Sequence, residues 1–231
     1  MKKNISRIII ILIIGAIGGS LFQVLILPGL IGHPYFGNLE MIKRLKNQVI
    51  VNPVEQIFIG QDTALEEAIK KVEDTVVGFN NGSGIIITSD GLIITLADVL
   101  PKTEKYLFLE GEKVNFEVVR KDLDQNLALI KIEQKNILAC KFADLSDIKM
   151  GQKVFLLGVI VENEIPKSIT NQGSIKMFDD DIIRTNILED KILNGSPLFN
   201  VWGEVLGLNV IDGQGKVSTI PIDNIRKFAG F

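Results

Sequence analysis

The chain has 231 residues, with 25 lysines and arginines, 28 aspartates and glutamates, and a formal net charge of −3. Lys2, Lys3 and Arg7 all precede the first apolar run, so the rest of the chain carries 22 basic and 28 acidic residues, a net of −6. A net-acidic domain without a basic block is a poor candidate for nucleic-acid binding, and we expect no nucleic-acid partner.

The amino-terminal segment is predicted to anchor the protein in a membrane. Residues 8–27 read IIIILIIGAIGGSLFQVLIL and contain no charge. At about 1.5 Å per residue, this helix would span a hydrocarbon core of ~30 Å. The basic tail 1–7 should stay in the cytoplasm. The alternative is a cleaved signal peptide, but the apolar region of a signal peptide is normally only about 7–15 residues long. We therefore expect a single-pass protein of the cytoplasmic membrane with its carboxyl-terminal domain outside, periplasmic or on the cell surface.

Residues 28–61 are predicted to form an extracytoplasmic tether, because Pro28, Pro34 and Pro53 interrupt any regular element. The only histidine of the chain, His33, lies in this tether shortly after the predicted span. No histidine is therefore available to the folded region, which excludes a histidine-based catalytic triad. We assign His33 no role.

The remaining residues, 62–231, are predicted to form an all-β domain with short flanking helices. Asp62 can cap a helix that begins near Thr63, and residues 221–228 are typical of a closing helix. Between them, short β-branched runs alternate with glycine and charged turns, and residues 89–91 (SDG) are a strong hairpin signal. This spacing favours a β-sandwich or barrel. The expected strands are 76–79, 84–87, 92–95, 106–109, 114–119, 127–132, 154–157, 182–187, 205–210 and 217–220.

Two features that could indicate chemistry are interpreted as structural. Cys140 is the only cysteine and lies in residues 137–142, which read as a strand, so we expect a small buried apolar residue. Asp179, Asp180 and Asp181 form an acidic run, for which a solvated hairpin turn is favoured over a cation site because no histidine or matching ligand spacing accompanies it. We expect no metal and no cofactor.

Five stretches in order resemble one protein family. They are 82–95 (GSGIIITSDGLIIT), 122–132 (DLDQNLALIKI), 150–158 (MGQKVFLLG), 194–200 (NGSPLFN) and 219–223 (TIPID). They are similar to the opening hairpin, the D-x-x-x-D-L-A-L-L-K-I strand, and the V-G-D-x-V-x-x-x-G, G-N-S-G-G-P-L-x-N and A-I-P-I-D motifs of HtrA/DegP-type trypsin-like serine proteases. The resemblance covers residues 64–229. It implies the chymotrypsin fold, two packed antiparallel six-stranded β-barrels with the active-site cleft between them. Because the chain stops after the closing helix, we expect no PDZ domain.

The catalytic residues of that family are predicted to be missing. The family's histidine lies in T-x-x-H-V, its aspartate precedes L-A-L, and its serine lies in G-N-S-G-G-P. We assign these positions to Ala97, Asn126 and Asn194. An alanine cannot act as a base, an Asp-to-Asn change in the triad of trypsin costs about 10⁴ in kcat, and an asparagine amide is no nucleophile. Ile192 replaces the glycine at the oxyanion position, which places the oxyanion hole in doubt.

Ser196 is the nearest hydroxyl that could serve as an alternative nucleophile. Lys191 is the candidate base in a Ser–Lys dyad, and both Lys191 and Asp98 are expected near the cleft. A lysine must be desolvated to act as a base, whereas Lys191 follows Glu189 and Asp190 in an acidic turn. We therefore expect Ser196 to occupy the second-glycine position as a structural residue.

The sequence thus predicts a membrane-anchored, proteolytically inactive HtrA/DegP-like homologue that acts as a binding or scaffold module of the cell envelope. The expected partner is an extended peptide or an envelope protein, held at the cleft or at a sheet edge by strand addition. Two alternatives are a residual serine endopeptidase around Ser196, and a subunit that forms a homo-oligomer or assembles with active homologues.

Overall fold

The computed structural model describes residues 15, 18–22, 61–103 and 105–231, and the chain divides into two compact units, Met1–Phe58 and Ile59–Phe231. The predicted tail 1–7, the tether with His33 and most of the predicted span 8–27 lie outside the described residues. Within the described ranges, no helix is both long enough and apolar enough to cross a membrane.

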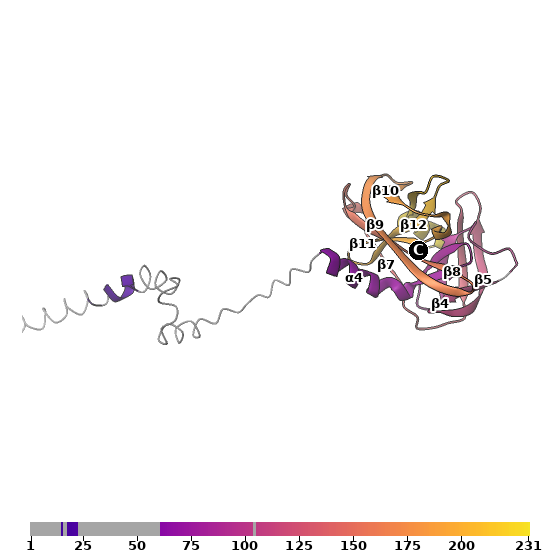
Figure 1. Ribbon diagram of the computed structural model, residues 1–231, viewed down its shortest axis with the longest axis horizontal. Helices are drawn as coiled ribbons and strands as arrows, with labels where there is room; N and C mark the ends of the chain where they lie inside the picture. Colours follow the sequence, from indigo (N-terminus) through magenta and orange to yellow (C-terminus); the bar gives the residue numbers. More distant parts are fainter. Residues whose placement is uncertain (1–14, 16–17, 23–60, 104) are drawn as a thin grey trace, which may run out of the picture. The chain divides into compact units, whose positions relative to one another are not determined.

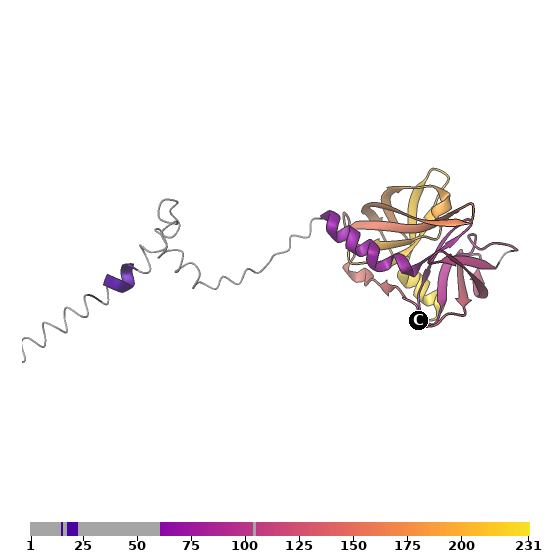
Figure 2. The same cartoon turned by 60° about the horizontal axis from the view of Figure 1, so that its bottom comes forward.

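The second unit begins with helix α4 (Gln61–Val72), which starts one residue before the predicted cap Asp62 and continues into η2 (Glu73–Thr75). The helix buries Ala68 and Val72 and lies across the outside of the β-structure (Figures 1 and 2). Lys71 Nζ donates a hydrogen bond to the carbonyl oxygen of Trp202 at 2.8 Å, which holds the helix against a turn of the second barrel.

Six strands close the first barrel in the order β1-β2-β3-β6-β5-β4. They are β1 (Val76–Phe79), β2 (Gly82–Ile86), β3 (Leu92–Leu96), β4 (Tyr106–Leu109), β5 (Glu112–Asp122) and β6 (Leu127–Ile132). The predicted hairpin at residues 89–91 joins β2 to β3, and Gly91 has a φ of 96°, which a glycine adopts without strain.

Six further strands form the second barrel in the order β11-β8-β9-β10-β13-β12, and a β11–β12 pairing closes it. They are β8 (Lys153–Glu162), β9 (Ile165–Phe178), β10 (Ile183–Leu188), β11 (Pro197–Asn200), β12 (Glu204–Ile211) and β13 (Lys216–Pro221). The short β7 (Lys141–Phe142) adds to β12 in parallel. Between β7 and β8 lies η3 (Leu145–Asp147), and helix α5 (Ile222–Ala229) closes the chain.

The predicted all-β fold with two antiparallel six-stranded barrels is confirmed, and each predicted strand has a counterpart. Two long-range elements were missed. The 14-residue β9 is mostly exposed, so it has no apolar periodicity, and its pairing with β8 stabilises it. The four-residue β11 is wholly buried but too short to stand out. Of the stretch 137–142, which read as a strand, only Lys141–Phe142 is one.

The two barrels share a continuous hydrophobic core. Phe79 and Phe116 pack edge to face inside the first barrel, with ring centroids 5.8 Å apart. The same cluster of buried side chains continues to Phe155 and Phe199, which stack at 5.2 Å where the two barrels meet. A second cluster, which includes Leu156, fills the interior of the second barrel. Burial of this apolar surface fixes the barrels against each other.

Cys140 is partly buried against this core. Its backbone N–H donates to the carbonyl oxygen of Ile86 at 2.9 Å, and burial raises the pKa of its thiol to about 12. A thiol reacts as the thiolate, so the folded chain holds Cys140 in an unreactive, protonated form at neutral pH.

We therefore expect Cys140 to react with a thiol reagent such as DTNB on the order of 10³-fold more slowly at pH 8 in the folded chain than in guanidinium, because an exposed cysteine has a pKa of about 8.5. The rate should rise steadily as the pH is raised from 8 toward 11. A fast, pH-independent reaction of the folded chain would contradict the burial of this thiol.

Candidate functional site

Asn126 lies in the turn between β5 and β6 and binds the segment that follows β3. Its side-chain Oδ1 accepts the backbone N–H of Asp98 at 3.1 Å, and its carbonyl oxygen accepts the N–H of Ala97 at 3.0 Å. The turn requires a φ of 51° at Asn126, a conformation that asparagine tolerates better than most residues. The structure thus brings the predicted histidine and aspartate positions together.

Asp98, rather than Ala97, occupies the histidine position. Counted from Thr95, the fourth residue of the T-x-x-H-V pattern is Asp98, so the assignment to Ala97 is one residue early. Ala97 is buried at 1% exposure, whereas Asp98 is exposed and its backbone is bound by the Asn126 side chain. This position thus carries a carboxylate.

Asn194, the predicted nucleophile position, is half-buried and follows the 3₁₀ helix η4 (Lys191–Leu193). Its carbonyl oxygen accepts the N–H of Ser83 on β2 at 2.8 Å. Its side-chain Oδ1 accepts the N–H of Ile211 on β12 at 2.7 Å. The side-chain amide of Asn194 therefore binds the second barrel, and its backbone carbonyl binds the first.

Gly195 brings this segment against the first barrel. Its φ is 75°, and a Cβ atom there would collide with the Ser83 carbonyl oxygen and approach Thr95 Oγ1 to 2.9 Å. Thr95 begins the T-x-x-H-V stretch, so contacts around Gly195 join the nucleophile position to the strand that leads to Asp98. These contacts place the segment that contains Asn194 against β3, the strand that precedes Asp98.

Ser196 is fully buried, at 0% exposure, and its Oγ accepts a hydrogen bond from Asn209 Nδ2 at 3.1 Å. Asn209 Oδ1 in turn accepts the hydroxyl of Thr219 at 2.7 Å. Lys191 is exposed and contributes to lowering the pKa of Asp212, behind the larger effect of the backbone N–H donors of Lys216 and Gln214. Lys191 therefore lies near Asp212, and no described base contacts Ser196.

The backbone donors at the oxyanion positions are already occupied. The N–H of Ile192 donates to Asp190 Oδ1 at 3.0 Å. The N–H of Asn194 donates to the carbonyl oxygen of Lys191 at 2.9 Å. An oxyanion hole needs such groups free and aimed at the developing charge. In this structure they close a turn instead.

A hollow of about 420 Å³ lies beside Asn126, between the barrels and α5. Gln125 and Leu127, on either side of Asn126, line one wall, and Ile220 of β13 and Lys227 of α5 line another. Arg120 also lines it; its Nη1 donates to the Phe228 carbonyl oxygen at 2.8 Å. This hollow is an opening that an extended ligand could enter next to the site.

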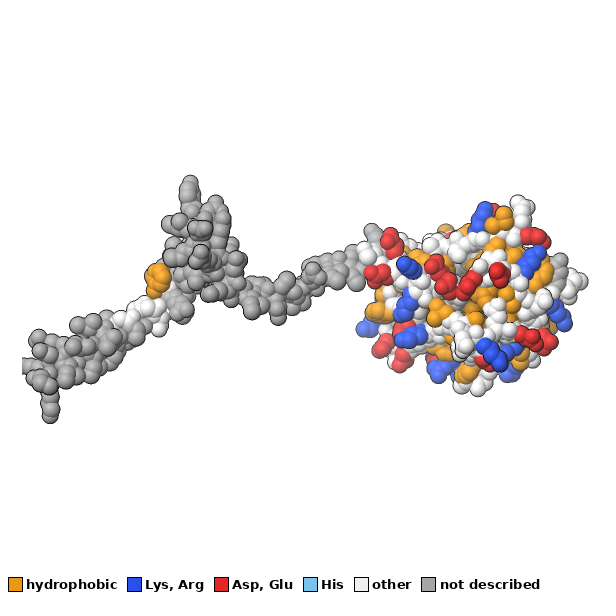
Figure 3. Space-filling view, turned by 90° about the horizontal axis from the view of Figure 1, so that it is seen from below, with side chains coloured by type: hydrophobic (Ala, Val, Ile, Leu, Met, Phe, Trp, Pro, Cys, Tyr) orange, Lys and Arg blue, Asp and Glu red, His pale blue; other side chains and the backbone are white. Residues whose placement is uncertain are grey.

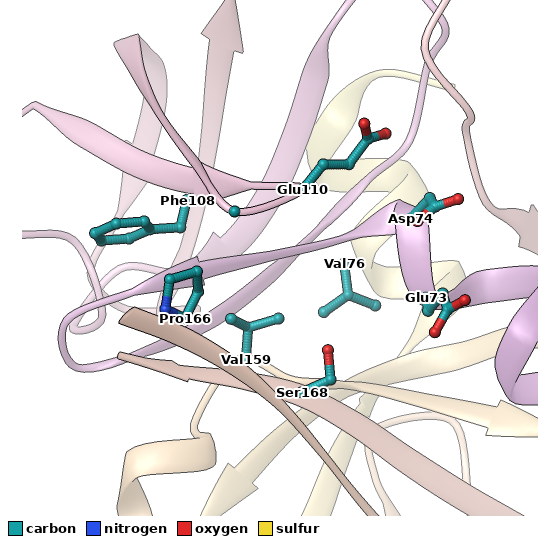
Figure 4. A pocket seen from close by; sticks show the side chains of 9 residues that line it. Glu73, Asp74, Val76, Phe108, Glu110, Val159, Pro166 and Ser168 are labelled. Carbon is teal, nitrogen blue, oxygen red and sulfur yellow. The ribbon is translucent and has the colours of Figure 1, made fainter. Parts of the chain in front are cut away.

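A smaller hollow, of about 190 Å³, lies away from these positions (Figure 4). Glu73 and Asp74 border it on one side, Phe108 and Pro166 on the other, and Val159 lies in its floor. None of the assigned triad positions lines it.

The acidic run 179–181 forms the turn between β9 and β10, as predicted, and Asp179 Oδ1 accepts the N–H groups of Asp181 and Ile182. In the described parts of the chain, no group of three or more metal-ligating side chains gathers. Figure 3 shows acidic and basic side chains interspersed on one face. The expected absence of nucleic-acid binding stays a prediction.

Three site residues escaped sequence reasoning: Asp190, Ser83 and Asn209. Asp190 caps η4 through the N–H of Ile192, and its spacing of two residues is the one signal that could have been read. Ser83 Oγ accepts the N–H of Val159 at 2.9 Å, and Asn209 binds Ser196. The Ser83–Val159 and Asn209–Ser196 pairs join separate segments of the chain, so no local sequence pattern predicts them.

Comparison with known proteins gives similarity to one group. A model of the trypsin-like peptidase domain matches residues 82–208. Serine protease HTRA4 of Mus musculus is 34% identical over 162 residues, which cover 64% of this chain and 34% of that protein. A probable periplasmic serine endoprotease DegP-like of Halomonas elongata is 30% identical over 135 residues, covering 55% of this chain and 28% of that protein. The chain spans about a third of the length of these relatives.

Among solved structures, the serine endoprotease from Yersinia pestis is similar, with a TM-score of 0.64 at 21% sequence identity. The match covers 72% of this chain and 65% of that chain. At this identity the likeness supports the fold alone.

The occupied oxyanion donors lead to a prediction about restoring a triad. A variant with Asp98→His, Asn126→Asp and Asn194→Ser should hydrolyse fluorescein-casein at least about 10²-fold more slowly than the same variant with Asp190→Ala and Ile192→Gly added, because each missing oxyanion donor costs about 10²–10³ in kcat. Replacing position 194 by alanine in the five-site variant is the control. Equal rates for the three-site and five-site variants would show that the occupied donors do not matter.

Proposed function

The chain belongs to the trypsin-like peptidase family as an HtrA/DegP-like serine protease homologue, and from that premise we propose that it is a proteolytically inactive member that binds an extended peptide or envelope protein. The observation that carries this proposal is the state of the site. The nucleophile position is an asparagine whose amide binds Ile211, and both oxyanion donors are bonded within their own turn.

The replacement of the triad follows from the register described above. Asp98 cannot serve as the neutral base that a serine needs, and Asn126 cannot stabilise an imidazolium that is absent. Asn126 still accepts the backbone N–H of Asp98, so the substituted site keeps its packing without its chemistry.

The proposed location is the outer side of the cytoplasmic membrane, with residues 8–27 as a single-pass anchor and the amino terminus inside. This proposal rests on the uncharged run of twenty residues and the preceding cations. A tethered domain would meet its partners at the membrane surface, where a homo-oligomer or an assembly with active homologues could also form.

The binding role is supported by the opening between the barrels. The 420 Å³ hollow adjoins Asn126 and offers the apolar surface of Leu127, the charge of Lys227 and the amide of Gln125. Its lining also includes Asp181 and Asn224, so charged and amide groups lie beside a smaller apolar surface. An extended peptide can enter such an opening without any catalytic group being present.

Selection from a phage-displayed library of extended decapeptides tests this role. Gln125→Trp should fill the hollow and weaken the selected peptides at least about tenfold, equivalent to ~1.4 kcal/mol. Gln214→Trp is the matched control, because both glutamines are exposed and each is held only through its backbone N–H, by Asp122 and Asp212 respectively. Failure to enrich any peptide, or equal binding by the two variants, would count against the proposal.

The alternative, a residual endopeptidase around Ser196, is disfavoured by the burial of that hydroxyl and its bond with Asn209. We expect a fluorophosphonate probe to leave Ser196 unmodified, because a serine without a contacting base is a weak nucleophile. Mass spectrometry of the treated full-length chain checks this, with trypsin labelled in parallel as the positive control. Modification of Ser196 that is lost in Ser196→Ala would establish the alternative.

A further inference from the structure

One strand edge in the first barrel remains open although the barrel is closed. β4 pairs with β5 only over residues 112–115, and the N–H of Phe116, which donates to the Lys105 carbonyl oxygen at 3.0 Å, is the last bond on that side among the described residues. Beyond it, residues 117–121 pair with β6 on one side. On the other side no described segment forms a backbone hydrogen bond with them. Unpaired backbone groups of this kind are a template for another strand.

The side chains of this segment are unusually accessible. All five residues from 117 to 121 are exposed, including Val118 at 44% and Val119 at 56%. The register shifts between Val118 and Arg120, so Val119 is a bulge residue with no Cα partner on β6. Two exposed β-branched residues on a free edge favour strand pairing.

The segment is complementary to itself. When the sequence Glu-Val-Val-Arg-Lys is paired antiparallel with a second copy about Val119, Glu117 of each copy lies opposite Lys121 of the other. Neither residue forms an ion pair within the described chain, and the β6 neighbour of Glu117, Lys131, is bound to Asp90. Opposite charges directly across a strand pair are stabilising.

Arg120 does not oppose this pairing. Its guanidinium donates to the Phe228 carbonyl oxygen and lies 4.8 Å from the centre of the Phe228 ring. The charge is therefore held against α5 of its own chain. Natural sheets often use charges and bulges to prevent edge pairing. The two remaining charges, on Glu117 and Lys121, have opposite signs and lie at equal distances from Val119. A second copy paired about Val119 therefore places each charge opposite its counter-charge.

We propose that two copies of this chain associate through antiparallel pairing of their β5 edges, with the two-fold axis at Val119. The same surface of each copy contacts itself, as a two-fold interface requires. This surface contains none of the residues assigned to the catalytic site and only Arg120 of the hollow beside Asn126, so the inference is independent of the proposed peptide-binding role.

Disulfide cross-linking of the full-length chain in detergent micelles tests the register. Val119→Cys should form a cross-linked dimer at least about fivefold faster than Leu138→Cys, because a disulfide needs Cα atoms within about 7 Å of each other. Leu138 is a matched control, since it is an apolar side chain of similar exposure, 51%, away from this edge. The pKa of the native Cys140 thiol is raised to about 12, so this thiol stays protonated and adds little background. Equal cross-linking at the two positions would overturn the proposal.

A charge exchange tests the complementarity. Lys121→Glu should raise the dimer dissociation constant at least about tenfold, because it places like charges opposite each other at two symmetric sites, and Glu117→Lys should do the same. The double variant with both changes should restore the original affinity, as measured by sedimentation in micelles. Asp147→Lys, a charge change at an exposed site in η3, is the control. An unchanged dissociation constant in Lys121→Glu, or no rescue by the double variant, would overturn the proposal.

Discussion

The structure depends on a small set of backbone hydrogen bonds that fasten the two barrels together. Residues 194–196 bind both sides: the Asn194 carbonyl accepts the N–H of Ser83 in the first barrel, and Gly195 and Ser196 exchange bonds with Asn209 in the second. The Ser83 hydroxyl also bonds to the backbone N–H of Val159. Because these groups are buried, leaving any of them unpaired would cost about 1–3 kcal/mol. The junction therefore tolerates changes in side-chain chemistry far better than changes in backbone path.

That constraint is compatible with the proposed loss of the triad. Asn126 accepts the N–H of Asp98, and Asn194 accepts the N–H of Ile211, so both asparagines contribute to packing through their amide oxygens. The turn that contains Ile192 is closed by Asp190, which satisfies a donor that would otherwise face an empty cleft. Each group that catalysis would keep free is used to stabilise the junction, which is coherent with a binding role.

Barrel closure and the open edge of β5 are two results of the same geometry. Closing a barrel removes edges only where neighbouring strands are of similar length. β4 has four residues and β5 has eleven, so β5 extends beyond β4, and residues 117–121 pair with β6 but with no described strand on their other side. The second barrel contains a similar mismatch, because the 14-residue β9 pairs with the six-residue β10 only over residues 175–178. The surface that could bring two copies together therefore arises from a mismatch in strand length rather than from a dedicated element.

The sequence alone determined the fold class, most strands of the barrels and the presence of asparagine at positions 126 and 194. These features are local: β-branched runs between turns, a hairpin at residues 89–91, and motif residues at fixed spacing. Only the tertiary structure decided the rest. It identified β9, which pairing with β8 rather than apolar periodicity stabilises, and it showed that the Asn126 side chain binds the backbone of Asp98, 28 residues away. It also showed that Ser196 is buried beside Asn209, because contacts between separate strands depend on how the strands pair, and no single stretch of sequence specifies that pairing.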